Sequence, residues 1–592
     1  MKKTLLFSVA LAGLMLGSCS SSDDLNGGGN NTGSNQSGNG YVAFNINLPS
    51  QAGGSSRAND DFDAGMKSEY DVKDATLLIF EGSSESAAQF KGAYTLNTAP
   101  WKNNGQTDNI TTTSATIVKE IATPTSSDHC YALVVLNKND VFTVNENKSI
   151  TMKDATATFS GTYKQFAESL SEEDLTKNGF YMANAPLASK AGGATDPAGA
   201  EINTLANLDG KIKKTESEAK SAPAQIYVER GVAKVTMQND PSTAPNKVDG
   251  STKPDGTSSV GFEITSWVLD NTNKKTYLVR STDGFGDWTK LASNSTSLLA
   301  ANKYRFVGSN AVAANLYRTY FAKDANFDQT GNTAALAAGD LVTRSNPTFV
   351  NKFGNDNPQY CFENTFDVAC QNDNMTTRVL IKAKLNSGET FYVFNGDQNT
   401  IYPIDEVKNE IKKYFLTENE AWIKANVTPA TGKSEVNGDD LDVEITDAAG
   451  KVSITSITFK SGVTVSSSAT VPTNYDEVLK RIGSIDEYKN GESYYFVRIK
   501  HFGDDMTPWN TEETPKPSNL VYPTDNQAGN YLGRYGVLRN NWYDIAVEGV
   551  KGLGSATVPA VTPTTDDELK SYIAVKINVL SWAKRTQNAT LQ

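Results

Sequence analysis

Few residues in this sequence are of the types that carry covalent or metal chemistry. The chain contains four cysteines and two histidines, namely Cys19, Cys130, Cys361, Cys370, His129 and His501. They are too few and too scattered for most nucleophilic, acid–base or zinc sites. His129 and Cys130 are adjacent, and adjacent residues of a strand point to opposite faces, so they cannot form a dyad with each other. Since phosphate-binding loops, GxSxG and HExxH strings are also missing, the sequence predicts no enzyme, no cofactor and no metal site.

Two of these cysteines leave alternatives open. Cys361 and Cys370 lie nine positions apart in a loop-rich region. In an oxidising exterior two outcomes are open: the two cysteines form a disulfide, or both stay free thiols. A cluster of carboxylates in NGDDLDVE (residues 437–444) has the wrong spacing for an EF-hand, so we interpret it as a solvated turn rather than a calcium site.

The first 19 residues have the layout of a secretory signal. Lys2 and Lys3 precede an apolar run that ends in the string LGSC at 16–19, and the run is short for a membrane span. LGSC resembles a bacterial lipobox, in which the signal is cut before the cysteine and the thiol of that cysteine, here Cys19, receives a lipid. The alternative is an ordinary signal peptide with an incidental cysteine. The resemblance implies an outer membrane lipoprotein precursor.

A polar tether and one strand follow the signal. Residues 20–40 are rich in Gly, Asn and Ser and cannot bury a core. The next segment, YVAFNINLP, alternates with period two, which predicts a strand with one apolar face; that face carries Val42, Phe44, Ile46 and Leu48. A Gly/Ser-rich stretch with Arg57 ahead of an acidic cluster comes next, and such exposed stretches are where proteases cut. The alternative is a plain surface loop after a first strand.

The rest of the chain predicts an all-β protein with few short helices. Short apolar runs alternate with polar turns, a pattern typical of sandwiches; the predicted strands are 75–80, 130–136, 226–237, 262–269, 276–279, 378–385, 452–459, 494–499, 542–547 and 572–580. Helical spacing appears around 404–414, at 475–482 and, as a surface helix, over 164–175. Because 68 acidic residues outnumber 55 basic ones, for a net charge of −13, nucleic acid is not an expected partner.

A break in this pattern divides the body. The stretch 238–256 is rich in Pro, Gly and polar residues, which predicts a boundary between two domains. The expected organisation is a signal peptide over 1–19, a tether and removable strand over 20–57, an N-terminal β-sandwich over 58–250 and a C-terminal β-sandwich over 251–592.

Several segments together resemble the fimbrillins of Bacteroidales type V pili, most closely the shaft subunit of the short (minor) fimbria. They are EYDVKDATLLIFEG (69–82), CYALVVLN (130–137), GFYMANAPL (179–187), IYVERGVAKVTM (226–237) and GVLRNNWYDIAVEGVKGLGSATVP (536–559). The resemblance implies two transthyretin-like β-sandwich domains in tandem. It also implies export as a lipoprotein and cleavage after Arg57 by an arginine-specific protease, which leaves Ala58 as the first residue and removes Cys19 with the strand.

Loss of an interior strand would leave a groove that needs a replacement. The C-terminal segment supplies a candidate with the same period-two spacing in Ile573, Val575, Ile577 and Val579. Strand addition from one copy to the next gives an open filament. The alternative is that 573–579 is a permanent strand and that 584–592 or a rearranged hairpin is the donor.

The sequence therefore predicts a shaft subunit of a surface fimbria that supports adhesion. Its expected partners are identical subunits, accessory or anchor fimbrial proteins, the protease, and host or bacterial surface receptors. Two alternatives stay open: a tip or accessory fimbrial adhesin, favoured by the extra length of the chain, and a tethered surface lipoprotein that binds glycans.

Overall fold

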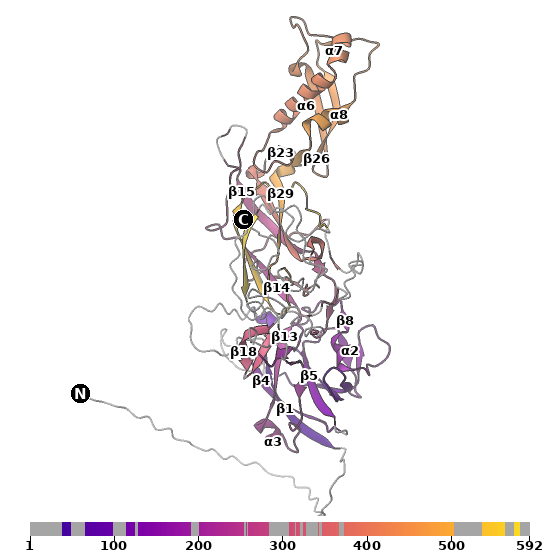
Figure 1. Cartoon of the computed structure of the whole chain (residues 1–592), viewed down its shortest axis with the longest axis vertical. Helices are drawn as coiled ribbons and strands as arrows, with labels where there is room; N and C mark the ends of the chain where they lie inside the picture. Colours follow the sequence, from indigo (N-terminus) through magenta and orange to yellow (C-terminus); the bar gives the residue numbers. More distant parts are fainter. Residues whose placement is uncertain are drawn as a thin grey trace, which may run out of the picture.

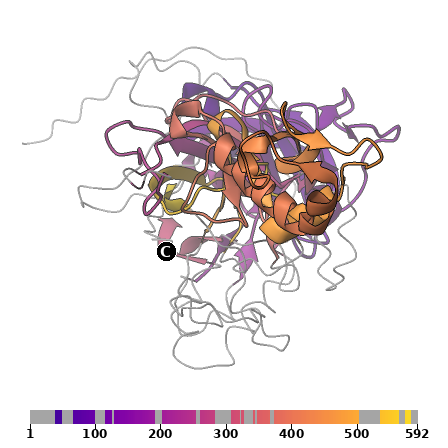
Figure 2. The same ribbon diagram turned by 90° about the horizontal axis from the view of Figure 1, so that it is seen from above.

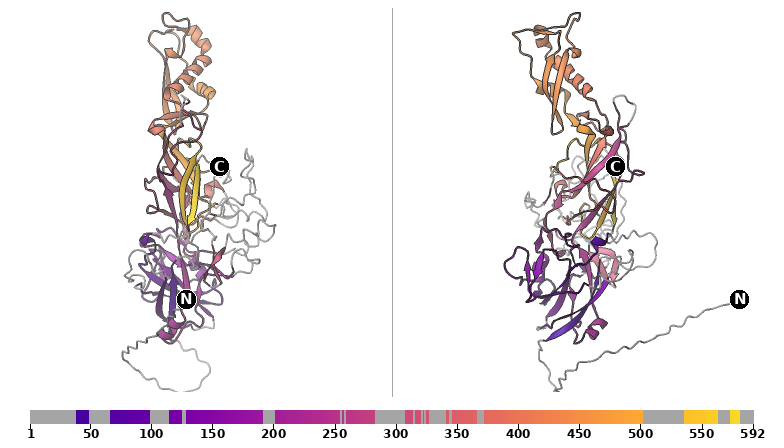
Figure 3. Two further views of the ribbon diagram at one scale, coloured as in Figure 1. Left: turned by 90° about the vertical axis from the view of Figure 1, so that its left-hand side faces the viewer. Right: turned by 180° about the vertical axis from the view of Figure 1, so that it is seen from behind.

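The computed structural model describes residues 38–48, 66–98, 114–124, 128–190, 201–253, 256, 259–282, 307–313, 315–319, 322, 324–326, 341–342, 346–365, 372–501, 535–562 and 573–580. These residues are mostly β-strand with few helices, as predicted from the sequence. Three bodies, each around its own hydrophobic cluster, follow one another along an elongated molecule (Figures 1 and 3). We call them the N-terminal body, the middle body and the distal module.

The N-terminal body is built on an eight-stranded sheet in the order β3-β2-β5-β9-β13-β1-β4, with β12 added beside β5. Its strands are β1 (Asn39–Asn47), β2 (Ala75–Gly82), β3 (Gln89–Thr95), β4 (Ser114–Ala122), β5 (His129–Leu136), β9 (Met182–Asn184), β12 (Ala206–Asn207) and β13 (Ala224–Arg230). The first half of β13 pairs with β1 and its second half pairs with β9. Strand β13 therefore joins the β4-β1 pair to the rest of the sheet.

Short elements complete this body. They are η1 (Lys67–Glu69), β6 (Phe142–Val144), β7 (Ile150–Met152), α2 (Tyr163–Ala167), β8 (Leu170–Ser171), β10 (Leu187–Ala188), β11 (Ile202–Asn203), α3 (Glu216–Ser221), β17 (Thr276–Tyr277), β18 (Val307–Ala313) and β19 (Leu316–Thr319). Helix α3 lies at the end of the molecule farthest from the distal module (Figure 1).

The middle body contains two sheets, β21-β14-β30-β31 and β15-β22-β29, and a small β16-β20 pair. The strands are β14 (Ala233–Gln238), β15 (Phe262–Asp270), β16 (Thr272–Asn273), β20 (Leu341–Val342), β21 (Gln359–Cys361), β22 (Arg378–Leu385), β29 (Glu492–Arg498), β30 (Trp542–Val550) and β31 (Ile573–Leu580), with 3-10 turns η6 (Asp373–Met375), η7 (Asn386–Gly388) and η9 (Lys489–Gly491). Strand β14 runs parallel to β30 and antiparallel to β21. This repeats the placement of β1, which runs parallel to β13 and antiparallel to β4.

The distal module is inserted between β22 and β29. Its sheet has the order β23-β28-β26-β25. The elements are β23 (Phe391–Phe394), α6 (Ile404–Glu418), α7 (Glu420–Asn426), β24 (Val427–Thr428), η8 (Gly438–Asp440), β25 (Leu441–Ala448), β26 (Lys451–Phe459), β27 (Thr464–Val465), α8 (Tyr475–Ile482) and β28 (Ile485–Tyr488). Figure 2 looks along the molecule from this end, with the module (orange) in front.

Two of the predicted helices are present in this module. Helix α6 buries Val407, Ile411 and Phe415 against the sheet, whereas Ile404, the first residue of the predicted helical spacing, is 41% exposed. Helix α8 buries Val478 and Ile482, and the N–H of Gly483 after it donates to the carbonyl of Leu479. The φ of 96° at Gly483, a conformation that glycine adopts readily, turns the chain out of the helix. Among the described residues, none of the helices has both the length and the apolar character that a membrane span requires.

The helix predicted over 164–175 is wrong. Only α2 forms, and the chain then turns into β8, which pairs with β17. Phe166 is fully buried but Leu170, four residues later, is 54% exposed, so the two do not share a helix face. Pairing with a strand about 105 residues away overrides the local helical spacing.

The prediction of a single strand over 226–237 is also wrong, because this segment forms two strands, β13 and β14, in different bodies. At the break, the N–H of Gly231 donates to the carbonyl of Tyr181, and the carbonyl of Val232 accepts from the N–H of Asn540. Val232 packs in the first hydrophobic cluster and Ala233 in the second. The division at residue 250 and the transthyretin-like assignment stay predictions.

Candidate functional site

The strongest candidate site is the place of β1 in the N-terminal body. The predicted alternation of this strand is observed: Val42, Phe44 and Ile46 are fully buried and Leu48 is 6% exposed. All four belong to the first hydrophobic cluster. Tyr41, Asn45 and Asn47 on the other face are half-buried.

The backbone of β1 is paired on both edges. It pairs in parallel with β13 at four positions, from Phe44 opposite Ala224 to Asn47 opposite Tyr227. On its other edge it pairs antiparallel with β4 at nine positions, from Asn39 to Asn47. Among the described strands, β4 pairs with β1 alone. Removing β1 would therefore open two edges and separate β4 from the sheet.

Polar contacts fix the register of β1. The Asn47 side-chain amide donates to the carbonyl of Ile226 at 3.0 Å, and that of Asn45 donates to Oε1 of Gln225 at 2.9 Å. At the other end, the N–H of Tyr41 donates to the carbonyl of Lys213 at 2.8 Å, and the N–H of Lys213 donates back at 2.9 Å. This end lies beside α3.

The C-terminal strand β31 is paired on one edge only within the described residues. It runs antiparallel to β30 at eight positions, with a bulge between Val547 and Gly549. Val575 is buried in the second hydrophobic cluster. The structure thus places the predicted donor residues Ile573, Val575, Ile577 and Val579 in an end strand of their own middle body.

A buried ion pair ties the segment that follows Arg57 in sequence to the middle body. The carboxylate of Glu69, at the end of η1, lies 2.9 Å from the ammonium of Lys234 on β14 and accepts from the hydroxyl of Tyr360 on β21 at 2.5 Å. The backbone carbonyl of Glu69 accepts from Nε of Arg230 at 2.9 Å. Burial lowers the pKa of Arg230 to about 10, a range in which the guanidinium stays charged at neutral pH.

The RNNWY motif at 539–543 lies at the same place, which we call the junction between the N-terminal body and the middle body. Arg539 pairs with Glu363 at 2.5 Å and donates to Oγ1 of Thr276 at 2.8 Å. The N–H of Arg230 donates to the side-chain oxygen of Asn540 at 3.2 Å. The Nε1 of Trp542 donates to Oγ1 of Thr236 at 2.7 Å. This motif therefore joins the N-terminal body to the middle body.

A third buried pair adds charge to this junction. Arg280 and Glu229 lie 2.8 Å apart and both are almost fully buried. Burial raises the pKa of Glu229, and the cations of Arg280 and Arg539 act in the opposite direction. Sequence reasoning missed these junction residues. Their only signal was charged residues within an otherwise apolar run, as in YVERGVAKV at 227–235.

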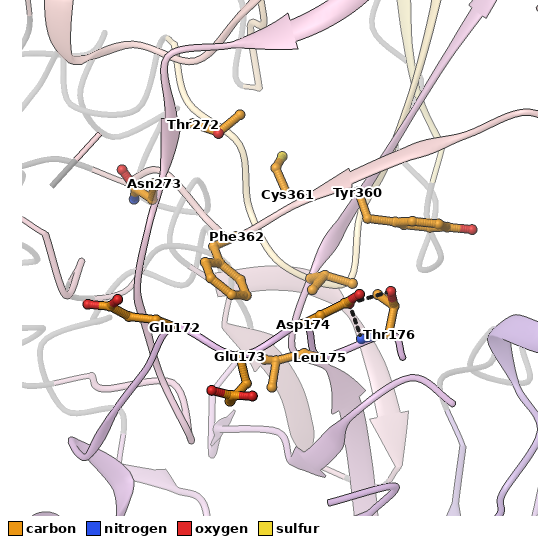
Figure 4. A pocket seen from close by; sticks show the side chains of 11 residues that line it. Glu172, Glu173, Asp174, Leu175, Thr176, Thr272, Asn273, Tyr360, Cys361 and Phe362 are labelled. Carbon is orange, nitrogen blue, oxygen red and sulfur yellow. Dashed lines mark hydrogen bonds between the residues drawn. The ribbon is translucent and has the colours of Figure 1, made fainter. Parts of the chain in front are cut away.

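A cavity of about 380 Å³ opens beside the junction, and Figure 4 shows its lining. Acidic residues Glu172, Glu173 and Asp174 line one part, but Asp174 accepts hydrogen bonds from the N–H and hydroxyl of Thr176 (Figure 4) and Glu173 pairs with Lys153. The carboxylates of Glu173 and Asp174 are therefore engaged within the protein. Among the described residues no group of three or more His, Cys, Asp or Glu side chains could hold a metal ion.

The remaining predicted sites lie at or beyond the limits of the described residues. Cys19, Arg57, Ala58 and Cys370 are outside them. Cys361 is a buried free thiol that lines the cavity, and burial raises its pKa to about 12. The bridge between Cys361 and Cys370 stays a prediction.

Residues 486–588 match the family described as "Major fimbrial subunit protein type IV, Fimbrillin, C-terminal". The matched region contains β29, β30 and β31, and it includes the motif at 536–559. The C-terminal part of the chain is therefore fimbrillin-like, in agreement with the predicted resemblance. Among curated proteins no relative matches the chain.

Three solved structures are similar to the chain at low identity. A proposed cell adhesion protein from Parabacteroides distasonis ATCC 8503 has 11% identity and a TM-score of 0.36, covering 93% of this chain and 99% of that one. A proposed cell adhesion protein from Bacteroides eggerthii DSM 20697 has 12% identity and a TM-score of 0.30, covering 93% and 98%. A fimbrial assembly protein from Parabacteroides distasonis ATCC 8503 has 10% identity and a TM-score of 0.21, covering 41% and 66%. TM-scores this low do not establish a shared fold.

Proposed function

We propose that this chain is the precursor of a shaft subunit of a cell-surface fimbria, and that copies polymerise by replacing β1 with a strand of the next copy. The observation that carries this proposal is the position of β1, an interior strand that is paired on both edges. Its covalent connection to the rest of the body runs through the segment that contains Arg57. The fimbrillin-like C-terminal part supports the same assignment.

Maturation follows from the order of the segments. Cys19 would receive the lipid and hold the precursor at the outer membrane. An arginine-specific protease would then cut between Arg57 and Ala58. Since β1 lies between Cys19 and Arg57 in sequence, this one cut frees the lipid anchor and the strand together. Glu69 stays bonded to Lys234, so the new end of the chain remains attached to the junction.

The energetics favour a replacement for β1 over an empty site. Four buried apolar side chains contribute roughly 1.5–3 kcal/mol each, and each ladder hydrogen bond adds about 1 kcal/mol net. The gross gain from filling the site is on the order of 10 kcal/mol, enough to hold subunits together for long times. Before cleavage β1 occupies the site, so early polymerisation is prevented.

Strand β31 is the donor that the pairing favours. Within the described residues it pairs in its own body with one neighbour, β30, at eight positions. In the place of β1 it would lie between two neighbours, β13 and β4, which pair with β1 at four and nine positions. The exchange opens one edge of β30 and closes two edges in the acceptor copy. Identical subunits are thus the main partners, with accessory or anchor fimbrial proteins at the ends of the filament.

One observation favours the second candidate, a tip or accessory adhesin. The distal module has its own hydrophobic cluster and projects from the end of the molecule. It lies almost wholly outside the matched residues 486–588. A module that the shared region does not need is a natural place for binding a host or bacterial receptor.

The third candidate, a tethered glycan-binding lipoprotein, requires an uncut N-terminus. The match is to a structural subunit family, which agrees with a non-catalytic role.

Mutation of the cleavage position tests the proposal. We expect Arg57→Ala to stay lipidated and uncut and to form no filaments, because β1 still fills its site. Lys67→Ala, which removes a nearby cation on the other side of the acidic cluster, serves as the control and should mature normally. N-terminal sequencing of surface protein should give Ala58 for the unmodified chain. Filaments of Arg57→Ala at normal yield would contradict the proposal.

A further inference from the structure

We propose that Ile573–Val579 of one copy enters the β1 site of the next in the register and direction of Val42–Leu48, and that Ala574 sets this register by taking the place of Ala43. This inference rests on the proposed function and adds to it which residue pairs with which. It concerns a contact between two copies of the same chain.

The two segments match without a gap over eight residues, YVAFNINL against YIAVKINV. Four pairs are identical: Tyr41 and Tyr572, Ala43 and Ala574, Ile46 and Ile577, Asn47 and Asn578. Three further pairs exchange one apolar residue for another, and the last exchanges Asn45 for Lys576. Period-two spacing alone would require apolar residues at alternate positions. It would not require the same tyrosine, alanine and asparagine between them.

The site accepts only one register of this segment. Ala43 is 1% exposed although it lies on the face opposite Phe44, so its position admits only a small side chain. A shift by two residues would place either Tyr572 or Lys576 there, and overpacking or burying an unpaired charge is unfavourable. A shift by one residue would place Lys576 where Phe44 or Ile46 is fully buried. Only the register that puts Ala574 at the position of Ala43 avoids both overpacking and the burial of a charge.

The polar positions agree with this register. Asn47 donates to the carbonyl of Ile226, and Asn578, as the same residue type, can make the same bond. Asn45 is half-buried, so Lys576 in its place can extend its ammonium group to water while its stem covers the strand.

The register also fixes the direction of the neighbour. A donor that runs like β1 is parallel to β13, and Ile573 then lies toward the end of the site where Tyr41 bonds to Lys213. One residue earlier, a Cβ at Gly40 would lie 2.5 Å from Cγ2 of Ile212, so a residue with a side chain does not fit there and the part of the site that a donor can fill starts at the place of Tyr41. The body of the donor copy therefore lies beyond α3, at the end opposite the distal module (Figure 1), and the filament is head to tail.

Disulfide trapping tests the register. Thr116 on β4 is opposite Asn45, and Val118 is opposite Ala43. A chain with Lys576→Cys and Thr116→Cys should give a ladder of covalent oligomers after cleavage and oxidation, whereas Lys576→Cys with Val118→Cys should give none. A ladder from the second variant, or filaments that neither variant links, would overturn the register while leaving strand exchange standing. If the cleaved unmodified chain forms no filaments, the proposed function fails and the register with it.

A second substitution tests the role of Ala574 itself. Ala574→Leu should lower the filament yield by about tenfold or more, since a misfit of 1.4 kcal/mol already gives that factor. Ala574→Ser, close in size, should polymerise normally. Both variants must show the thermal midpoint of the unmodified monomer, so that a loss of polymer reports on the donor step. Normal polymerisation of a folded Ala574→Leu chain would overturn the proposal.

Discussion

The carboxylate of Glu69 and the ammonium of Lys234 lie 2.9 Å apart with 0% and 1% of their side chains exposed. Glu69 follows the predicted cleavage position by twelve residues in sequence, and Lys234 is on β14, the first strand of the middle body. This pair therefore links the start of the expected mature chain to the second hydrophobic body.

Breaking this pair should destabilise the mature protein strongly. Glu69→Ala leaves the buried ammonium of Lys234 without its carboxylate, a change that typically costs about 3–5 kcal/mol in the free energy of unfolding. Urea unfolding followed by tryptophan fluorescence measures this difference. Glu216→Ala is the control, because its pair with Lys220 is more than half exposed and should leave the midpoint unchanged. Equal midpoints for both variants would show that the buried pair does not hold the bodies together.

Phe44→Ala should destabilise the precursor and leave the mature monomer unaffected. Phe44 is fully buried, and truncating a buried phenylalanine costs about 3–5 kcal/mol. Once β1 has been removed by cleavage, the substituted residue is no longer part of the protein. Unfolding measured before and after treatment with an arginine-specific protease separates the two states. Asn45→Ala, on the half-buried face, should cost the precursor much less. A loss that persists in the cleaved protein would mean that β1 stays bound.

The thiol of Cys361 should be inert in the native protein. Burial raises its pKa to about 12, so at pH 8 almost no thiolate is present to react with iodoacetamide. Mass spectrometry should find Cys361 unmodified after native labelling and fully modified after labelling in guanidinium chloride. A disulfide between Cys361 and Cys370 in the same spectra would instead support the bridge predicted from the sequence.

The distal module should be removable without loss of assembly. Phe394 and Ile485 are directly opposite each other on β23 and β28, so an Asn-Gly turn can replace residues 395–484 as a two-residue hairpin. We expect this variant to be cut and to form filaments, because β1 and β31 are untouched. Receptor binding by cells that carry such filaments distinguishes the adhesin role from the shaft role. Loss of filaments with both bodies folded would place the module in the assembly contact.

Much of the local structure followed from sequence patterns. The period-two spacing of Val42 to Leu48 depends only on strand geometry, so the buried face of β1 was predictable. The helices at 404–418 and 475–482 were predictable for a similar reason, since their apolar residues recur at helical spacing. The prediction was wrong at 164–175 and at 226–237, where hydrogen bonds to Tyr277, Tyr181 and Asn540 redirect the chain.

The sequence by itself determined the strand content, the apolar faces of the first and last strands and the likeness between those two strands. Each of these depends on residues close together in the chain. Only the tertiary structure decided that β1 lies between β13 and β4, that β31 is an end strand, and that Glu69, Arg230 and Arg539 meet at one junction. Those relationships join residues up to several hundred positions apart, and the pairing of strands over such distances depends on the packing of the whole body rather than on any local pattern.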